Sequence, residues 1–198
     1  MLIVSSIYLI PIFYVLSIYS ITFSVLLGWN VPRILLLIPL LFGVSNYLVA
    51  FLLNKEKNDK IFTSAVIVKY SLIPFFIMGG IVICFCFLLG IIPHLSFLMI
   101  SNIVFIFTGY LILVLGSAYQ IAHIKNLIEN HEISLLFGIV LIILSLVFTF
   151  DVISVMMLSL SKNKHRKLTI AVIIVLLALS MAAIVWFIYS VFMNARKG

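Results

Sequence analysis

The chain has 198 residues, of which 66% are hydrophobic and only 9% are charged. A soluble domain carries charges on about a quarter of its residues, so this composition excludes a water-soluble protein. Twelve Lys and Arg against five Asp and Glu leave a net charge of +7. Basic loops of a membrane protein explain that excess without any nucleic acid partner.

Long apolar runs indicate the fold class. A run of about 20 apolar residues matches a hydrocarbon core about 30 Å thick. Because lipid offers no hydrogen-bond partners, such runs must be helices or strands of a closed barrel. The run "LTIAVIIVLLALSMAAIVWFIYSVF" is apolar on every side and lacks the alternation of a barrel strand. We therefore predict an all-α, multi-pass protein of the cell membrane, with the lipid bilayer as its surroundings and residues 1–198 as a single transmembrane domain.

Six transmembrane helices follow from the apolar runs taken in chain order. The first ends at "GWNVPR", where Trp29 suits the membrane interface and Pro32 stops a helix. The second ends at the charged stretch "NKEKNDK". The predicted helices cover about 2–27, 34–53, 70–92, 96–119, 134–150 or 134–158, and 168–193.

Two apolar segments are longer than one membrane crossing requires. As single helices, 61–92 and 134–161 would reach about 48 and 42 Å. The pieces 55–69 and 119–133 also mix apolar and polar residues at helical spacing. We therefore predict two short amphipathic segments lying in the interface. Phe62 and Ile124 are their expected contacts with a partner protein.

Asp151 and Lys69 are the ionisable residues inside apolar runs. A charge at the bilayer centre costs at least about 2.5–3.5 kcal/mol, so such residues usually pair or serve a function. In the favoured interpretation, Asp151 is solvated where the fifth helix leaves the hydrocarbon, and 151–161 lies along the interface. Lys69 then extends to the opposite interface, and Asp151→Asn has a mild effect. In the alternative, the two residues meet near the middle of the membrane and form a pair.

Other polar residues are expected to serve packing. Asn46, Asn102 and Gln120 can form hydrogen bonds between helices. Cys84 and Cys86 lie in an apolar run, where cysteine is usually inert. His123 and His131 lie in a polar connection with Glu129 and Glu132 close by, where a solvated loop is favoured over a metal site. No motif for nucleophilic or metal catalysis is present. We predict neither an enzyme nor a cofactor or metal site.

The distribution of basic residues weakly favours an orientation with both the N-terminus and the C-terminus in the cytoplasm. With six crossings and the N-terminus inside, six Lys and Arg lie in cytoplasmic segments and five in outer ones. The inner set is Lys55, Lys57, Lys60, Lys125, Arg196 and Lys197, and the outer set is Arg33, Lys162, Lys164, Arg166 and Lys167. An antiparallel dual-topology protein would show a similar near-tie.

Three stretches carry a family resemblance: "VIVKYSLIPFFI" (66–77), "SAYQIAHIKNLIENHEIS" (117–134) and "FTFDVISVMMLSL" (148–160). They resemble an uncharacterised family of small multi-pass membrane proteins from Gram-positive bacteria. The resemblance implies a bacterial cell-membrane location and supplies no activity.

Two functions fit these features. The first is a transport-type, permease-like membrane subunit that needs a separate partner, such as an ATPase docked on the amphipathic segments. The second is a non-transporting interaction protein that binds another membrane protein as an immunity, assembly or regulatory factor. Either function is compatible with a homo-oligomer. Against transport, the apolar runs contain few of the polar residues that mark solute pathways.

Overall fold

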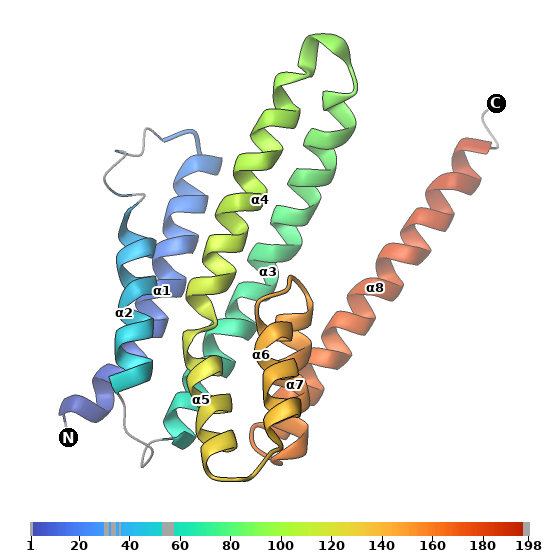
Figure 1. Cartoon of the computed structure of the whole chain (residues 1–198). Helices are drawn as coiled ribbons and strands as arrows, with labels where there is room; N and C mark the ends of the chain where they lie inside the picture. Colours follow the sequence, from blue (N-terminus) through green and yellow to red (C-terminus); the bar gives the residue numbers. More distant parts are fainter. Residues whose placement is uncertain (1, 30–31, 33–34, 36, 53–57, 196–198) are drawn as a thin grey trace. The chain divides into compact units, whose positions relative to one another are not determined.

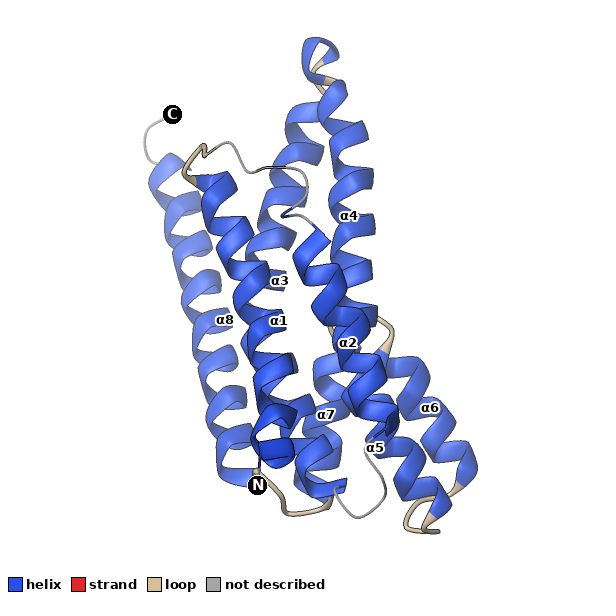
Figure 2. Ribbon diagram, turned by 90° about the vertical axis from the view of Figure 1, so that its left-hand side faces the viewer, coloured by secondary structure: helices blue, strands red, loops and turns tan. Residues whose placement is uncertain are grey.

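The computed structural model describes residues 2–29, 32, 35, 37–52 and 58–195. Among these residues every regular element is a helix (Figure 2), which confirms the all-α prediction. Five of the basic residues used to predict orientation lie outside the described residues, namely Arg33, Lys55, Lys57, Arg196 and Lys197.

The described residues include eight α-helices and, before α4, the short 3₁₀ helix η3. They are α1 (Leu2–Leu26), α2 (Ile38–Leu52), α3 (Asn58–Gly90), η3 (Pro93–Leu95), α4 (Phe97–Gly116), α5 (Ala118–Glu129), α6 (Leu135–Ser145), α7 (Phe150–Ser161) and α8 (Arg166–Ala195). Four of them, α1, α3, α4 and α8, are long and apolar enough to cross a membrane. The other apolar helices are shorter, so the six expected crossings are not confirmed.

The chain divides into two compact units, Met1–Val155 and Met156–Gly198. The first contains α1 to α6 and the start of α7, and the second contains the rest of α7 and α8. Within the first unit, α3 packs against α1, α4 and α5. Helix α2 packs against α1, α4 and α5 as well, so α1 to α5 form one helical core (Figure 1).

Helix α3 runs without interruption through the region expected to contain an interfacial segment. No break separates the predicted interfacial piece from the predicted crossing at residue 70. Ile61 and Ala65 belong to a buried cluster with residues of α2 and α5, so this first part of α3 is covered by protein. Pro74 also lies within α3. One turn before it, the carbonyl of Ser71 accepts a hydrogen bond of 2.7 Å from the hydroxyl of Tyr19.

Helix α1 ends where the sequence provides a stop. Gly28 has φ 71°, a left-handed conformation that glycine adopts without strain. Its N–H donates to the carbonyl of Val25, and the N–H of Trp29 donates to that of Ser24, both at 3.0 Å. This is a Schellman motif, which satisfies carbonyls left unpaired at a helix end.

Helix α5 ends with the same pattern of hydrogen bonds. His131 has φ 57°, and its N–H donates to the carbonyl of Ile128 at 3.0 Å. The N–H of Glu132 donates to the carbonyl of Leu127 at 2.9 Å. The short polar turn that follows leads into α6, which is capped by the hydroxyl of Ser134. The helical character predicted for 119–133 is thus confirmed up to Glu129.

Candidate functional site: a buried ion pair at a helix break

An ion pair between α3 and α7 lies inside the first unit. The Nζ atom of Lys69 is 2.9 Å from Oδ2 of Asp151, and each residue is 1% exposed. Burying two charges costs several kcal/mol each in desolvation, on the order of what their mutual attraction returns. Such a pair therefore requires further hydrogen bonds, and both partners have them.

Ser117 is the second partner of the Lys69 ammonium group, which donates to Oγ of Ser117 at 2.7 Å. Ser117 occupies the junction where α4 ends and α5 begins. Its N–H donates to the carbonyl of Val114, so the carbonyl of Leu113 lacks its usual helical donor. The Ser117 hydroxyl lies 2.8 Å from that carbonyl and replaces the missing donor. A serine at a bend between two helices thus also contacts a buried charge.

Helix α6 brings a third element to the same place. The carbonyl of Ser145, the last residue of α6, lies 2.8 Å from the Ser117 hydroxyl. Carbonyls at a helix end have no partner in their own helix and carry partial negative charge. Because α4 and α6 both end here, their carbonyl ends favour the Lys69 ammonium group.

Asp151 lies in the first turn of α7, where the helix dipole favours an anion. Its Oδ1 accepts a hydrogen bond of 2.7 Å from the N–H of Val152. Just before it, Thr149 has φ 71°, a conformation that is strained for a β-branched residue. The four residues 146–149 therefore form a tight turn that places the start of α7 beside α3.

A second layer of polar groups lies beside the pair. The side-chain amide of Gln120 donates to the hydroxyl of Ser154. That hydroxyl donates in turn to the backbone carbonyl of Asp151 at 2.8 Å. Gln120 and Ser154 are both fully buried. The α5 and α7 helices are thus linked by side chains one turn away from the ion pair.

These contacts correct the favoured interpretation of the two charged residues. Asp151 is not solvated, and Lys69 does not extend to an interface, because each is enclosed and paired with the other. The alternative of a buried pair is the one the structure contains. The prediction that Asp151 begins a helical segment and accepts hydrogen bonds there is confirmed. The fifth predicted helix is broken at 146–149 instead of continuing to residue 150.

Phe62 and Ile124 do not form the exposed docking surface expected of them. Phe62 is 1% exposed and Ile124 is fully buried. Phe62 stacks on the ring of His123, with 4.5 Å between the ring centroids. The apolar faces of both amphipathic segments are therefore used for packing inside the protein, which removes the basis for assigning these two residues to a partner.

The remaining predicted polar residues are buried in α2, α4 and α5. Asn46 is fully buried, and neither end of its amide has a hydrogen-bond partner among the described residues. Asn102 is 6% exposed, and its Oδ1 likewise lacks a described partner. Of the three predicted amides, Gln120 is the one that joins the network around Asp151. On α5, burial also raises the pKa of the Tyr119 hydroxyl.

Three serines of the network were not identified from the sequence: Ser117, Ser145 and Ser154. Ser117 lies in the sequence "GSA" (116–118), and a run of small residues equally suits close helix packing. Serine is common in apolar helices because its hydroxyl can bond its own helix, as Ser45 does to the carbonyl of Leu41. Residue type alone could not separate the two roles. The available signal was the proximity of Ser154 to Asp151 in the sequence.

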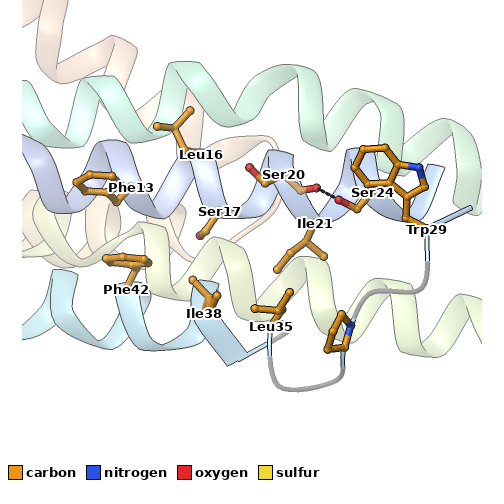
Figure 3. Close-up of a pocket in the computed structure, with 11 residues that line it drawn as sticks. Phe13, Leu16, Ser17, Ser20, Ile21, Ser24, Trp29, Leu35, Ile38 and Phe42 are labelled. Atoms are coloured by element: carbon orange, nitrogen blue, oxygen red, sulfur yellow. Dashed lines mark hydrogen bonds between the residues drawn. The ribbon is translucent and has the colours of Figure 1, made fainter. Parts of the chain in front are cut away.

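A separate pocket lies between α1 and α2 and has a volume of about 490 Å³ (Figure 3). Phe13 and Phe42 stack at one end of it, with 5.8 Å between their centroids. Two of its three serines direct their hydroxyls to their own helix: Ser17 donates to the carbonyl of Tyr14, and Ser24 donates to that of Ser20. The pocket is therefore apolar in character and unlike the charged site.

Other candidate chemistry is sparse in the part of the chain that the structure describes. Cys84 and Cys86 are free thiols on α3, the first exposed and the second half-buried. No group of three His, Cys, Asp or Glu side chains comes together among the described residues. The Lys69–Asp151 pair and its hydrogen-bonded neighbours are thus the principal polar constellation.

Fold and site together define a class: an all-helical, highly apolar protein with a lysine–aspartate pair enclosed at a helix break. The chain belongs to the family of unknown function DUF6652, whose model matches residues 1–165. The expected resemblance to an uncharacterised family is thereby confirmed. That match covers the whole network around Asp151. No curated protein matches the chain, and no solved structure does.

Proposed function

We propose that this protein is a transport-type, permease-like subunit of a bacterial cell membrane, and that the Lys69–Asp151 pair lies on the path of its solute or ion. The observation that carries the proposal is a charge pair fully enclosed within an apolar helical protein. Ionisable residues inside membrane helices are costly and commonly mark such pathways.

Two features of the surrounding backbone support the same conclusion. The pair lies where α4 gives way to α5, and where the turn between α6 and α7 brings a helix end and a helix start together. Membrane transporters often form their central sites from interrupted helices, whose ends offer unpaired backbone groups to a ligand. Irregular backbone at that depth is tolerated only where protein or a polar cavity surrounds it.

The pair also offers a chemical means of changing state. The arrival of a ligand that competes for Lys69 or Asp151 weakens the attraction between α3 and α7. A ligand with different affinities for the paired and separated arrangements would shift the balance between them. Alternating exposure of a site requires a change of this kind. Any separate energising subunit would bind somewhere other than Phe62 and Ile124, since both are buried.

The test is transport by the purified protein in proteoliposomes on a solid-supported membrane. Concentration jumps of small cations, carboxylates and zwitterionic amino acids are applied, and charge movement is recorded. We expect at least one class to give currents in the wild type. The uncharged double variant Lys69→Met/Asp151→Asn should lose them while remaining folded, and Gly79→Ala, on the exposed part of α3, should retain them.

Two results would contradict the proposal. Undiminished currents in the uncharged double variant would remove the pair from the pathway. The second contradicting result has two parts. The wild type would give no current with any solute class, alone or with co-purifying proteins, and purification in mild detergent would recover a stoichiometric membrane partner. That outcome would replace transport with a non-transporting role in immunity, assembly or regulation.

A further inference from the structure

Helices α6 and α7 are each about half the length of a membrane crossing. They have 11 and 12 residues, which correspond to about 16 and 18 Å of helix against a hydrocarbon core of about 30 Å. Both are apolar. Neither helix can cross the membrane alone. If α7 continues in the direction of α6, the two form one broken crossing, and if α7 runs in the opposite direction, they return to the face where α6 began.

Contacts within the first unit establish that direction. The end of α6 lies beside the start of α5, because the carbonyl of Ser145 meets the hydroxyl of Ser117. The start of α7 lies at the same level, because Asp151 and Ser117 both bond Lys69. Farther along α7, Ser154 bonds Gln120, which lies farther along α5. From Asp151 to Ser154, helix α7 therefore runs in the same direction as α5, opposite to the direction of α6.

The turn between α6 and α7 packs against the middle of the long helices. The ring of Phe148 meets Phe76 of α3 edge-on at 5.8 Å and lies 6.0 Å from Tyr110 of α4, measured between centroids. A Cβ placed on Gly109 would lie 3.7 Å from the same ring. These three residues lie well inside the candidate spans of α3 and α4. The turn thus lies at the depth of the apolar interior.

We infer that α6 and α7 form a re-entrant hairpin, which enters the membrane and leaves it at the same face. That face is the one where α5 ends, and we call it the α5 face. The polar segment 162–167 then emerges at the α5 face, as 130–134 does. Five helices then cross the membrane: the four long ones, α1, α3, α4 and α8, and the 15-residue α2, which packs against both α1 and α5 and leads the chain back to the α5 face. Helix α8 then ends at the face opposite the start of α1.

Charge distribution independently favours this arrangement. With the hairpin, the sequence segments assigned to the α5 face contain eight Lys and Arg, and those assigned to the opposite face contain three, with Lys69 left out because it is inside α3. The eight are Lys55, Lys57, Lys60, Lys125, Lys162, Lys164, Arg166 and Lys167, and the three are Arg33, Arg196 and Lys197. The numbers of Lys and Arg on the two sides, nearly equal with six crossings, now differ clearly in favour of the α5 face. The positive-inside rule therefore makes the α5 face cytoplasmic.

Single cysteines provide the test. In a full-length background with Cys84→Ala and Cys86→Ala, one cysteine is introduced at Ser96, Asn130 or Asn163, and intact cells are treated with a membrane-impermeant maleimide. Ser96 lies in the turn between α3 and α4, and Asn130 lies just after α5. We expect immediate labelling of Ser96→Cys. Asn130→Cys and Asn163→Cys should react at least tenfold more after permeabilisation than before it.

The outcomes separate the two parts of the inference. If Asn130→Cys and Asn163→Cys react from opposite faces, the pair of helices crosses the membrane and the hairpin is wrong. If they react together from outside, the orientation is wrong. A reporter active only in the cytoplasm is the second measurement: fused after Asn163 it should give signal, and fused after Gly198 it should not. The reverse would overturn the five-crossing arrangement.

Discussion

The two parts of α3 differ sharply although both are apolar in sequence. In the first part, Ile61, Val68 and Leu72 are at most 1% exposed. In the second, Ile81 is 56% exposed and Leu88 is 64% exposed. The first part packs against other helices of its unit, and the second presents much of its surface outward. Hydrophobicity therefore shows that a residue avoids water, without showing whether protein or lipid surrounds it.

The two parts of α3 also differ in where their polar residues lie. The buried part of α3 contains Lys69 and Ser64, and the exposed part contains Gly79 and Gly80. In a soluble protein, a lysine is expected on the outside. In an apolar solvent that expectation reverses, because a charge is best accommodated among hydrogen-bonding protein groups. Each of the following variants is matched with a control that tests this contrast.

The largest effect is expected from separating the ion pair. Lys69→Met leaves the Asp151 carboxylate buried without its cation, at a cost of about 3–5 kcal/mol of stability. Adding Asp151→Asn removes the unpaired charge and should restore most of that loss. Thermal unfolding in mild detergent measures both variants. If the single and double variants lose equal stability, the two residues are not energetically coupled.

A somewhat smaller effect is expected at the core of α5. Ile124 is fully buried, so Ile124→Ala should cost about 2–5 kcal/mol through lost contacts and a cavity. The matched control is Ile103→Ala on α4, where the side chain is 68% exposed and the change should stay within about 0.5 kcal/mol. Equal losses, measured by the same unfolding assay, would contradict the assignment of α5 to the interior.

The bend between α4 and α5 should be more sensitive than an ordinary serine position. Ser117→Ala removes a hydroxyl that contacts the Lys69 ammonium group and two carbonyls, and we expect a loss of about 1–3 kcal/mol. Ser45→Ala removes a hydroxyl bonded to one carbonyl of its own helix, and its cost should be below about 0.5 kcal/mol. The difference between the two melting temperatures tests the role of Ser117 as a shared partner.

Glycines provide the last contrast. A Cβ on Gly43 would lie 2.7 and 2.8 Å from Cδ1 and Cβ of Leu115, so Gly43→Ala should destabilise the contact of α2 with α4 by about 1–3 kcal/mol. A Cβ on Gly79 meets no described neighbour within 4 Å. Gly79→Ala should stabilise α3 by about 0.5–1 kcal/mol through helix propensity. A stabilising Gly43→Ala would show that these helices do not pack closely there.

Much of the helical framework could be predicted from the sequence. The expected bounds of the first, fourth and last helices agree with α1, α4 and α8 to within a few residues, because long apolar runs between polar turns leave few alternatives. The break in the predicted fifth helix was expected near Asp151 for reasons of length, and it lies at 146–149. The surroundings of the first part of α3 could not be predicted, because the same amphipathic pattern arises whether protein or lipid headgroups cover it.

Composition by itself determined that this chain forms apolar helices, and the spacing of charged residues identified Asp151 and Lys69 as unusual. Only the tertiary structure decided that they meet. Eighty-two positions separate them along the chain, and their pairing depends on the turn at Thr149 and the bend at Ser117. Helical periodicity describes contacts within about one turn of a helix, whereas an ion pair between distant helices depends on how those helices pack and where each one ends.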